Sequence, residues 1–398
     1  MHETSLLVEN LLSMWWIGLA AFLGPVLAIA TRRVIPDVVW LLAFGVLIGP
    51  HALGLAVETE SVEFLRELGM GFLFLLAGFE VDTSEMRGRQ GRRAAVTWIV
   101  CAILGTAAGL VLVSGDVEVA IVLGIASTST ALGTLLPILK DAGAMGSPLG
   151  RATMVHGAFG ELLPIVAMSL LLSTRGTWQA AAVLVGFALA AVVTVAIPRR
   201  LFRRIPLLAR AFGAAADSTM QTTLRLTVWI LLSLMLLTAV LDLDVALGAF
   251  SAGLLANQAL SAVGPDHAHD IARKVEIVGF SVLIPVFFVT SGMGIDLGAV
   301  LAAWPMLLAF VAIIALVRGL PVFLRETWSD TGSGITGWRQ RAALGLYAST
   351  GLPIIVAVTQ IAAQEGLISD TAAAVMVTGG AVTVLVFPLV ASRLARTP

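Results

Sequence analysis

The sequence predicts an all-α membrane protein that crosses the bilayer about thirteen times, and three observations support this fold class. Of its 398 residues, 58% are hydrophobic and 12% are charged, whereas an average soluble domain has roughly 25% charged residues. The mean hydropathy is +0.98. Apolar stretches of spanning length recur along the chain, and basic residues gather in every second loop. The net charge of −1 gives no argument for a nucleic-acid partner.

The number of spans follows from the apolar segments along the chain. A transmembrane helix needs about twenty mostly apolar residues. Such segments occupy 11–30, 34–50, 61–80, 94–113, 117–138, 151–173, 179–197, 222–241, 243–260, 275–294, 298–321, 338–363 and 371–391. The second and the ninth are short for a full crossing.

The loop charges fix the orientation. One set of alternate loops, together with the C-terminal tail, holds 20 of the 24 Lys and Arg residues, and the opposite loops are acidic or neutral. Cytoplasmic loops of membrane proteins are enriched in Lys and Arg. We therefore expect a multi-pass protein of the cytoplasmic membrane, in contact with the lipid bilayer, with its N-terminus outside and its C-terminus in the cytoplasm. A wrong span count would scramble the alternation.

Two pairs of matching segments indicate an internal repeat. LLAGFEVD at 75–82 matches VTSGMGID at 289–296, and the Ala-Ser-Thr that begins at Ala126 matches the one at Ala348. The paired spans lie seven spans apart, which is an odd number, so the partners cross the membrane in opposite directions. This is the inverted-topology plan of secondary transporters. We expect a first repeat at 1–200, a cytoplasmic linker at 201–221 and a second repeat at 222–398.

Each repeat contains one span rich in residues that weaken a helix. These are IASTSTALGTLLP within 117–138 and YASTGLPIIVAV within 338–363. Unpaired backbone in hydrocarbon costs several kcal/mol per group, so such segments survive where they line a cavity or pack on protein. We predict two discontinuous helices that cross at the binding site; a Ser/Thr-rich helix that packs through small residues is the alternative.

Hydroxyl and carbonyl oxygens at such breaks are suitable ligands for a small cation. The candidate ligands are Thr128, Ser129, Thr130, Ser349 and Thr350.

Glu161 is the clearest charge inside a span, because it is the eleventh residue of 151–173. A charge at the bilayer centre costs at least ~2.5–3.5 kcal/mol, so it usually has a function. A carboxylate in these surroundings can bind either a proton or a monovalent cation. Competition of the two at one site is the minimal chemistry of a cation/proton exchanger. The alternative is a protonated, structural Glu.

Two other ionisable residues lie deep in spans. Arg318 is near the cytoplasmic end of 298–321, where it either supports the site, by stabilising a carboxylate or helix-end carbonyls, or extends its side chain to the interface. His156 lies five residues before Glu161 and on another face of the helix, so we interpret it as structural.

Several segments of the chain resemble a known family. FLFLLAGFEVD, the ASTSTALGTLLP break, Glu161, LGAFSAGLL at 247–255 and VFFVTSGMGID at 286–296 are similar to the cation:proton antiporter superfamily, in its monovalent cation:proton antiporter-2 branch of Kef-type and NapA-type sodium or potassium/proton exchangers. The resemblance implies an NhaA/NapA-like fold of thirteen helices, a dimerisation domain that forms a homodimer, and a core domain that moves like an elevator. It implies core spans at 94–113, 117–138, 151–173, 298–321, 338–363 and 371–391.

The resemblance also assigns roles to residues. Glu161 takes the position of the ion-binding acid, and Gly160 departs from the polar residue that usually precedes it. Arg318 resembles the Arg of electroneutral members, so one cation for one proton is the expected stoichiometry. No Gly-rich dinucleotide motif is present, and we expect no C-terminal nucleotide-binding domain and no cofactor.

Three alternative functions can be compared with the sequence. A membrane enzyme would need a motif such as HExxH or GxSxG, and the sequence has neither. An organic-anion transporter on a related fold would favour a basic or polar cavity, whereas the clear mid-span charge here is a carboxylate. A non-transporting sensor on the same fold is supported by the Gly160 departure alone.

Overall fold

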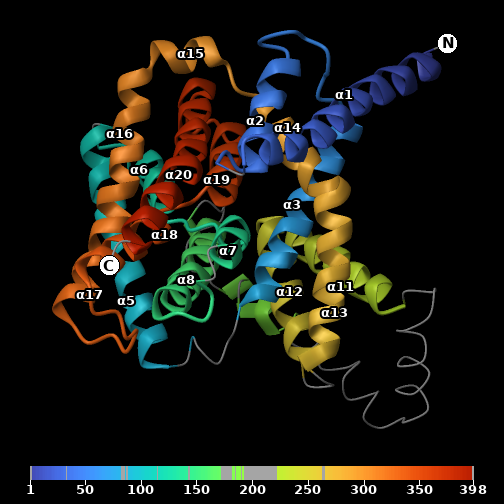
Figure 1. The fold of residues 1–398 in the computed structure, drawn as a ribbon. Coiled ribbons are helices and arrows are strands. Elements are labelled where there is room, and N and C mark those ends of the chain that lie inside the picture. Colours follow the sequence, from blue (N-terminus) through green and yellow to red (C-terminus); the bar gives the residue numbers. More distant parts are fainter. Residues whose placement is uncertain are drawn as a thin grey trace, which may run out of the picture. The chain divides into compact units, whose positions relative to one another are not determined.

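The computed structural model describes residues 2–32, 34–81, 86, 88–113, 115–141, 144–171, 182–183, 185–189, 191, 222–261 and 265–396. Within these ranges every regular element is a helix (Figure 1). The chain divides into two compact units. Unit 1 comprises 1–64, 82–168 and 285–398, and unit 2 comprises 65–81 and 169–284. Five of the six spans implied for the core domain lie wholly in unit 1, and the sixth, 151–173, lies in unit 1 as far as Met168.

Most helices begin and end within about five residues of the predicted spans. In unit 1 they are α1 (His2–Ala30), α2 (Asp37–Ile48), α5 (Arg89–Leu112), α6 (Val117–Ser127), α7 (Leu132–Asp141), α8 (Pro148–Leu171), α14 (Ile284–Met293), α15 (Leu297–Ala302), α16 (Trp304–Ile314), the π-helix η2 (Ala315–Gly319), α17 (Leu320–Trp328), α18 (Trp338–Ala348), α19 (Pro353–Gln364) and α20 (Asp370–Arg396). In unit 2 they are α3 (Glu60–Glu80, from Leu65 onward), α11 (Thr222–Val240), α12 (Val245–Ser261), α13 (Pro265–Val278) and the π-helix η1 (Gly279–Leu283). The exceptions are α1 and α13, which begin earlier than predicted, and α17, which ends later than predicted.

Nine helical segments in the described ranges are long and apolar enough to cross a membrane, and α2 and α12 are shorter apolar helices. This confirms a polytopic all-α membrane protein. The count of thirteen stays a prediction. The span at 179–197 lies mostly outside the described residues, and the linker at 201–221 lies wholly outside them.

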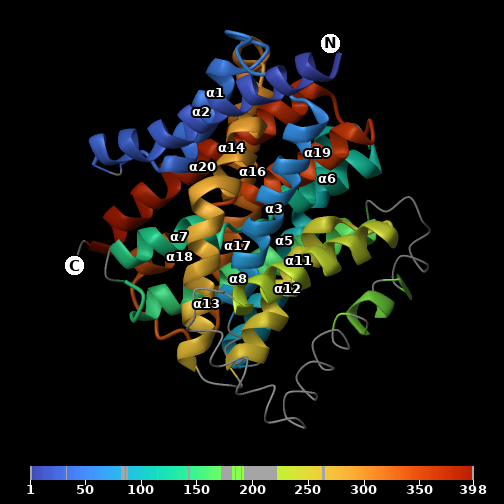
Figure 2. The same cartoon turned by 90° about the vertical axis from the view of Figure 1, so that its right-hand side faces the viewer.

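Both predicted breaks interrupt a helix. The first separates α6 from α7 at 128–131, and the second separates α18 from α19 at 349–352. α6 lies beside α19, whereas α7 packs against α18 in a shared apolar cluster (Figures 1 and 2). The first half of each broken helix therefore neighbours the second half of the other. The two run in opposite directions and cross at their breaks, as the inverted repeat predicts.

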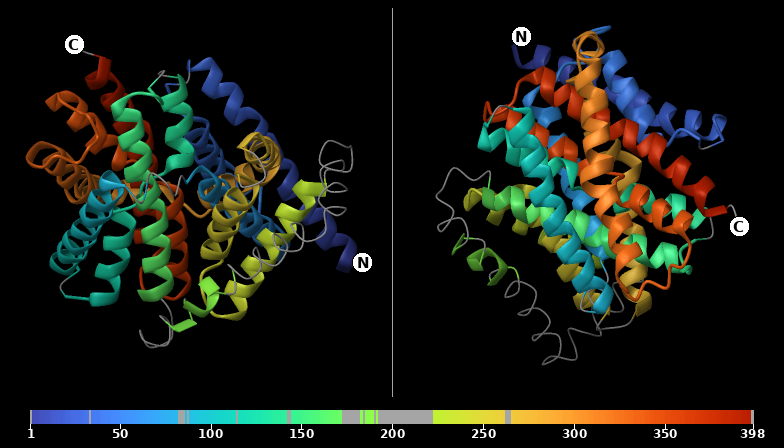
Figure 3. Two further views of the ribbon diagram at one scale, coloured as in Figure 1. Left: turned by 90° about the horizontal axis from the view of Figure 1, so that it is seen from below. Right: turned by 90° about the vertical axis from the view of Figure 1, so that its left-hand side faces the viewer.

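α5 and α6 lie side by side at the edge of unit 1 (Figure 3). Small residues make this close approach possible. A Cβ on Gly109 would lie 2.8 Å from the Cα of Ala120, and one on Gly124 would lie 2.8 Å from the backbone nitrogen of Thr106. The close packing fixes α6, and with it the first break, on a long continuous helix.

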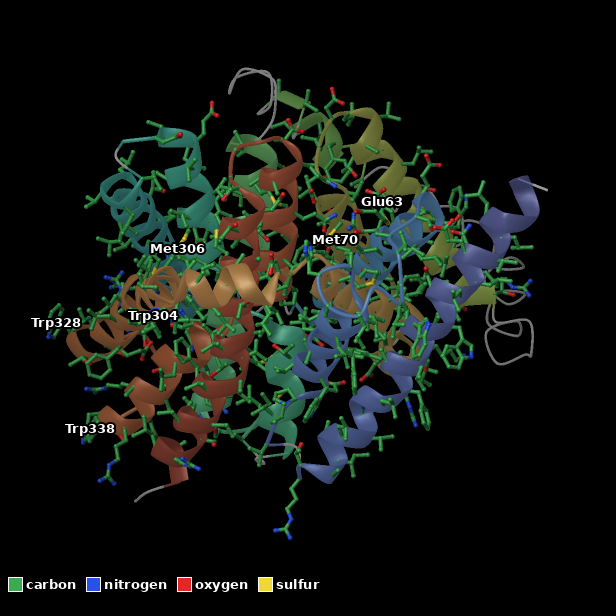
Figure 4. The ribbon with its side chains drawn as sticks, turned by 90° about the horizontal axis from the view of Figure 1, so that it is seen from above. Glu63, Met70, Trp304, Met306, Trp328 and Trp338 are labelled. Carbon is green, nitrogen blue, oxygen red and sulfur yellow. The ribbon has the colours of Figure 1, made fainter. Side chains whose placement is uncertain are left out.

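Tryptophans mark the ends of the segment α16–η2–α17. Trp304 begins it, Trp328 ends it, and both side chains are exposed. Trp328 and the exposed Trp338 point away from the unit at its rim (Figure 4). The segment has 25 residues, so it is about 37 Å long. That exceeds the roughly 30 Å of hydrocarbon and places each terminal Trp at headgroup depth, where Trp is enriched.

Candidate functional site

The crossing supplies hydrogen bonds that the broken helices lack. The N–H of Ala131 donates to the carbonyl oxygen of Thr350 at 2.7 Å, and the Thr130 hydroxyl donates to the carbonyl oxygen of Ala348 at 2.5 Å. The N–H of Thr130 donates to the carbonyl oxygen of Gly160 in α8 at 2.9 Å. Backbone groups freed at each break are thus satisfied by the other break and by α8, which is what apolar surroundings require.

A proline explains why Gly160 has a free carbonyl. Pro164 lies inside α8 and has no N–H. In a regular helix that N–H would bond to the carbonyl four residues earlier, which is the carbonyl of Gly160. The absence of this bond leaves the Gly160 oxygen available to Thr130. Pro164 therefore connects the first break with the helix that carries Glu161, two features that lie apart in the sequence.

Glu161 is 4% exposed, and its Oε1 accepts a 2.8 Å hydrogen bond from the N–H of Leu132, the first residue of α7. The positive end of a helix dipole stabilises a negative charge near it. Burial opposes the charged form of Glu161 and the α7 N-terminus favours it. A carboxylate balanced in this way can exchange a proton for a cation.

The other four predicted hydroxyls lie in the breaks and are buried. Each donates to a carbonyl oxygen three or four residues earlier at 2.8–3.1 Å; they belong to Thr128, Ser129, Ser349 and Thr350. These bonds cap the C-terminal ends of α6 and α18. A hydroxyl that donates its proton keeps oxygen lone pairs, so the four oxygens can still act as ligands.

Arg318 lies in the π-helix η2 and is fully buried. π-helical turns are rare and are frequent at functional sites. Its Nε donates to the carbonyl oxygen of Ala348 at 3.3 Å, and its Nη2 donates to Thr130 Oγ1 at 3.2 Å and to the His156 carbonyl oxygen at 2.8 Å. Its Nη1 lies 4.0 Å from the Cys101 sulfur. None of these partners is a carboxylate, and one of them, the carbonyl of Ala348, belongs to the last residue of α18.

The missing side chain at Gly160 has a steric reason. A Cβ there would collide with the Thr130 hydroxyl and would lie 2.8 Å from Arg318 Nη2. Thr130 and Arg318 therefore occupy the space that a polar side chain at this position would need. The sequence marked Gly160 as a departure from the family pattern but gave no sign of what replaces it.

Glu326 is a buried acid that the sequence analysis missed. Its Oε1 lies 3.9 Å from His156 Nε2, and both side chains are 2% exposed. Its Oε2 accepts hydrogen bonds from Ser333 at 2.6 Å and from Thr331 at 2.9 Å. In the sequence Glu326 stands between Arg325 and Trp328 at the end of an apolar run, which is typical of an interfacial residue, so no signal distinguished it.

A family model described as "Sodium/hydrogen exchanger, transmembrane" matches residues 18–397. Among curated proteins, YjbQ of Bacillus subtilis, named for Na⁺/H⁺ antiport, is 24% identical over 95% of this chain. The Na⁺/H⁺ antiporter NhaS5 of Synechocystis is 25% identical over 92% of the chain, and the Na⁺/H⁺-K⁺ antiporter GerN of Bacillus cereus is 24% identical over 80%. The chain spans 62% of YjbQ, 52% of NhaS5 and 82% of GerN.

A solved structure has the same fold. The sodium proton antiporter MjNhaP1 of Methanocaldococcus jannaschii aligns over 97% of both chains with a TM-score of 0.71 and 20% sequence identity. At this identity the likeness concerns the fold alone.

Proposed function

The chain belongs to the sodium/hydrogen exchanger family, and on that premise we propose that it exchanges a monovalent cation, Na⁺ or K⁺, for protons across the cytoplasmic membrane. The observation that carries the proposal is Glu161, a buried carboxylate at the N-terminus of a half-helix beside two crossed breaks. Antiport of Na⁺, and for GerN also of K⁺, is what the relatives' names state. Both cations are therefore candidates.

The exchange is a competition for one carboxylate. A proton binds Glu161 directly, whereas a cation also needs neutral oxygens to replace its water. Hydroxyl oxygens of Thr128, Ser129, Thr130, Ser349 and Thr350 are the proposed additional ligands. They come from both breaks, so the bound cation would interact with both halves of the crossing. A negatively charged carboxylate at the binding site repels an organic anion, which disfavours that substrate.

One titratable carboxylate also supports an electroneutral exchange. Gly160 adds no charge beside Glu161, and Arg318 is held by Ala348, Thr130 and His156 in the site as described. Arg318 therefore acts as a fixed charge, and one cation replaces one proton. Elevator-like movement of the core spans, a homodimer, and an N-terminus outside with a cytoplasmic C-terminus complete the proposal.

The test is reconstitution in liposomes with a trapped pH-sensitive dye. Na⁺, K⁺ and Li⁺ are added outside in turn, and the direction and rate of proton movement are recorded. We expect proton efflux with Na⁺ or K⁺, and the same initial rate when a membrane potential of either sign is imposed. A rate that follows the potential would contradict electroneutral exchange. No proton movement with any of the three cations would contradict the exchanger itself.

A further inference from the structure

Unit 1 contains a buried pair of titratable groups that the proposed exchange does not use. His156 lies on α8, the helix that carries Glu161, and Glu326 lies on α17, eight residues after Arg318. Their side chains are both 2% exposed, and Nε2 and Oε1 are 3.9 Å apart. Burying two ionisable groups this deeply costs folding free energy, and pairing offsets part of that cost.

The two carboxylate oxygens of Glu326 have different surroundings. Oε2 accepts hydrogen bonds from two hydroxyls, those of Thr331 and Ser333, in the buried part of the segment between α17 and α18. Oε1 faces His156 and accepts no hydrogen bond within the described residues. On the other side of the pair, His156 Nδ1 also lacks a hydrogen-bond partner among the described residues. Glu326 Oε1 and His156 Nδ1 are thus two buried polar atoms of the pair that have no hydrogen bond within the described part of the chain.

Within the described residues, charged groups of η2, of the segment after α17 and of α8 lie near the pair or in the elements that carry it. Arg318 in η2 donates to the backbone oxygen of His156 and acts electrostatically on its ring. From α5, Cys101 lies against Arg318 rather than against the pair. In the segment after α17, Asp330 is exposed and forms an ion pair with Arg89 at 3.2 Å. On α8 itself, Glu161 lies five residues further on, about 7.5 Å along the helix axis.

We propose that His156 and Glu326 together form a second proton-binding site, distinct from Glu161, that takes up a proton without binding the cation. The hydroxyls of Thr331 and Ser333 both donate to Oε2, which leaves Oε1 as the one Glu326 oxygen without a hydrogen bond within the described residues, and one oxygen does not complete the shell of a metal cation. A proton needs no cage of oxygens and is held on one atom of the pair, His156 Nε2 or Glu326 Oε1, which face each other at 3.9 Å. Because the two groups are coupled, the proton belongs to the pair rather than to either residue.

A proton on this pair changes cation binding at Glu161, and this step rests on the proposed exchange. Wherever the proton resides, it adds one positive charge about 7.5 Å along α8 from Glu161. At an effective dielectric constant of about 20, such a charge weakens cation binding on the order of ten- to a hundredfold. Acid therefore lowers cation affinity twice, once by competition at Glu161 and once through the pair.

The experiment measures the KM for Na⁺, or for K⁺ if that is the transported cation, between about pH 5 and pH 8 in proteoliposomes, the range in which histidine commonly titrates. Competition at Glu161 alone changes KM by at most about tenfold per pH unit. We expect the wild type to exceed this over part of the range. His156→Gln and Glu326→Gln should return to tenfold or less, and His51→Gln, at an exposed histidine, should behave as the wild type.

A second readout does not depend on transport. With histidine rings labelled by ¹³C, one NMR resonance that is absent from His156→Gln should titrate in this range, and Glu326→Gln should displace its midpoint. A wild-type KM that never changes more than tenfold per pH unit would overturn the proposal, as would a His156 resonance that does not titrate. Loss of all exchange in the wild type would instead refute the proposed function and leave the NMR test to decide this site.

Discussion

Pro164, Gly160 and Thr130 depend on one another, although Thr130 lies thirty residues before Gly160 in the sequence. Pro164 frees the carbonyl of Gly160 by lacking an N–H, and Thr130 uses that carbonyl for its own N–H. The Thr130 hydroxyl then fills the space beside Gly160, where Arg318 also reaches. The orientation of the first break relative to the acid-bearing helix thus depends on three small sequence features.

This arrangement predicts that a single methyl group at position 160 is harmful. In Gly160→Ala the new Cβ meets Thr130 Oγ1 and Arg318 Nη2, both of which are buried and hydrogen-bonded. We expect a loss of stability of roughly 1–3 kcal/mol, the usual range for overpacking, together with impaired exchange. Thermal unfolding of the purified protein measures it. Gly18→Ala, where a Cβ would meet nothing within 4 Å, is the control, and equal melting temperatures in the two variants would contradict the packing argument.

At the residue scale the sequence could reveal what is unusual in itself. Glu161 was predictable because an acid in the middle of an apolar span is costly. The partners of Arg318 were not predictable, because they are backbone carbonyls whose proximity depends on the crossing. Glu326 was missed because its pairing with His156 on α8 joins residues that are remote in the sequence, and because Thr331 and Ser333, although close in the sequence, follow it in a segment that reads as an exposed loop.

At the scale of elements, the breaks create helix ends inside the protein, and each end has a partner of suitable charge. The N-terminus of α7 faces the Glu161 carboxylate, and the C-terminus of α18 faces the Arg318 guanidinium. Negative groups stabilise helix N-termini and positive groups stabilise C-termini. The two charges therefore hold the half-helices in place, besides any role in transport.

The crossing itself can be tested at Gly351. A Cβ at this position would meet both the hydroxyl and the carbonyl oxygen of Ser129, which belongs to the other break. The carbonyl is backbone and cannot rotate away, so we expect Gly351→Ala to lower the melting temperature and to reduce exchange together. If Gly351→Ala melts and transports like Gly18→Ala, the breaks do not approach as closely as described.

In unit 2, Asp244 lies in the loop between α11 and α12, and its Oδ1 accepts a 2.7 Å hydrogen bond from the N–H of Ala246. Burial raises the pKa of Asp244 to about 7; the Ala246 N–H opposes the rise, and the charge of Glu67 adds to it. Because this pKa lies above the unfolded value, ionised Asp244 destabilises the fold. The loss of stability therefore develops as pH rises from about 4 to about 7.

Asp244→Asn keeps a side-chain oxygen for the cap but cannot ionise. We expect the variant to melt at a higher temperature than the wild type, with a gain that is larger at about pH 8 than at about pH 5. The difference between the two proteins at each pH removes the effect of other titrating groups. A gain that is equal at both pH values, or that is larger in acid, would mean that Asp244 stays ionised in the folded protein.

For the whole molecule, the fold was predictable because a membrane imposes strong rules. Spanning helices must satisfy their own backbone, so apolar length alone located both ends of α5, α11 and α20 to within five residues, whereas α1 begins nine residues before the predicted span. The two breaks were predictable because Ser, Thr, Gly and Pro gather there twice. The boundaries of α15, η2 and α17 inside the single predicted span 298–321 were not, since a π-helix and a short surface helix leave no mark in hydropathy.

The parity of the spans is a property of the whole chain and can be measured. Thirteen spans put the two termini on opposite sides, with the N-terminus outside. In a Cys101→Ala background, a cysteine added at the N-terminus should react with a membrane-impermeant maleimide on intact cells. One added at the C-terminus should react only after permeabilisation. Labelling of both termini from the same side would require an even number of spans and would contradict the predicted topology.

The most direct test of the central claim is the exchange activity of Glu161→Gln in liposomes with a trapped pH dye. Gln keeps the size and an oxygen that can accept from the Leu132 N–H, but it neither ionises nor binds a proton for exchange. Glu365→Gln, at an exposed position at the end of α19, is the matched control. We predict cation-driven proton efflux in the wild type and in Glu365→Gln, and none in a folded Glu161→Gln. Exchange that persists in Glu161→Gln would contradict the account, because the cation and the proton would then meet at another site.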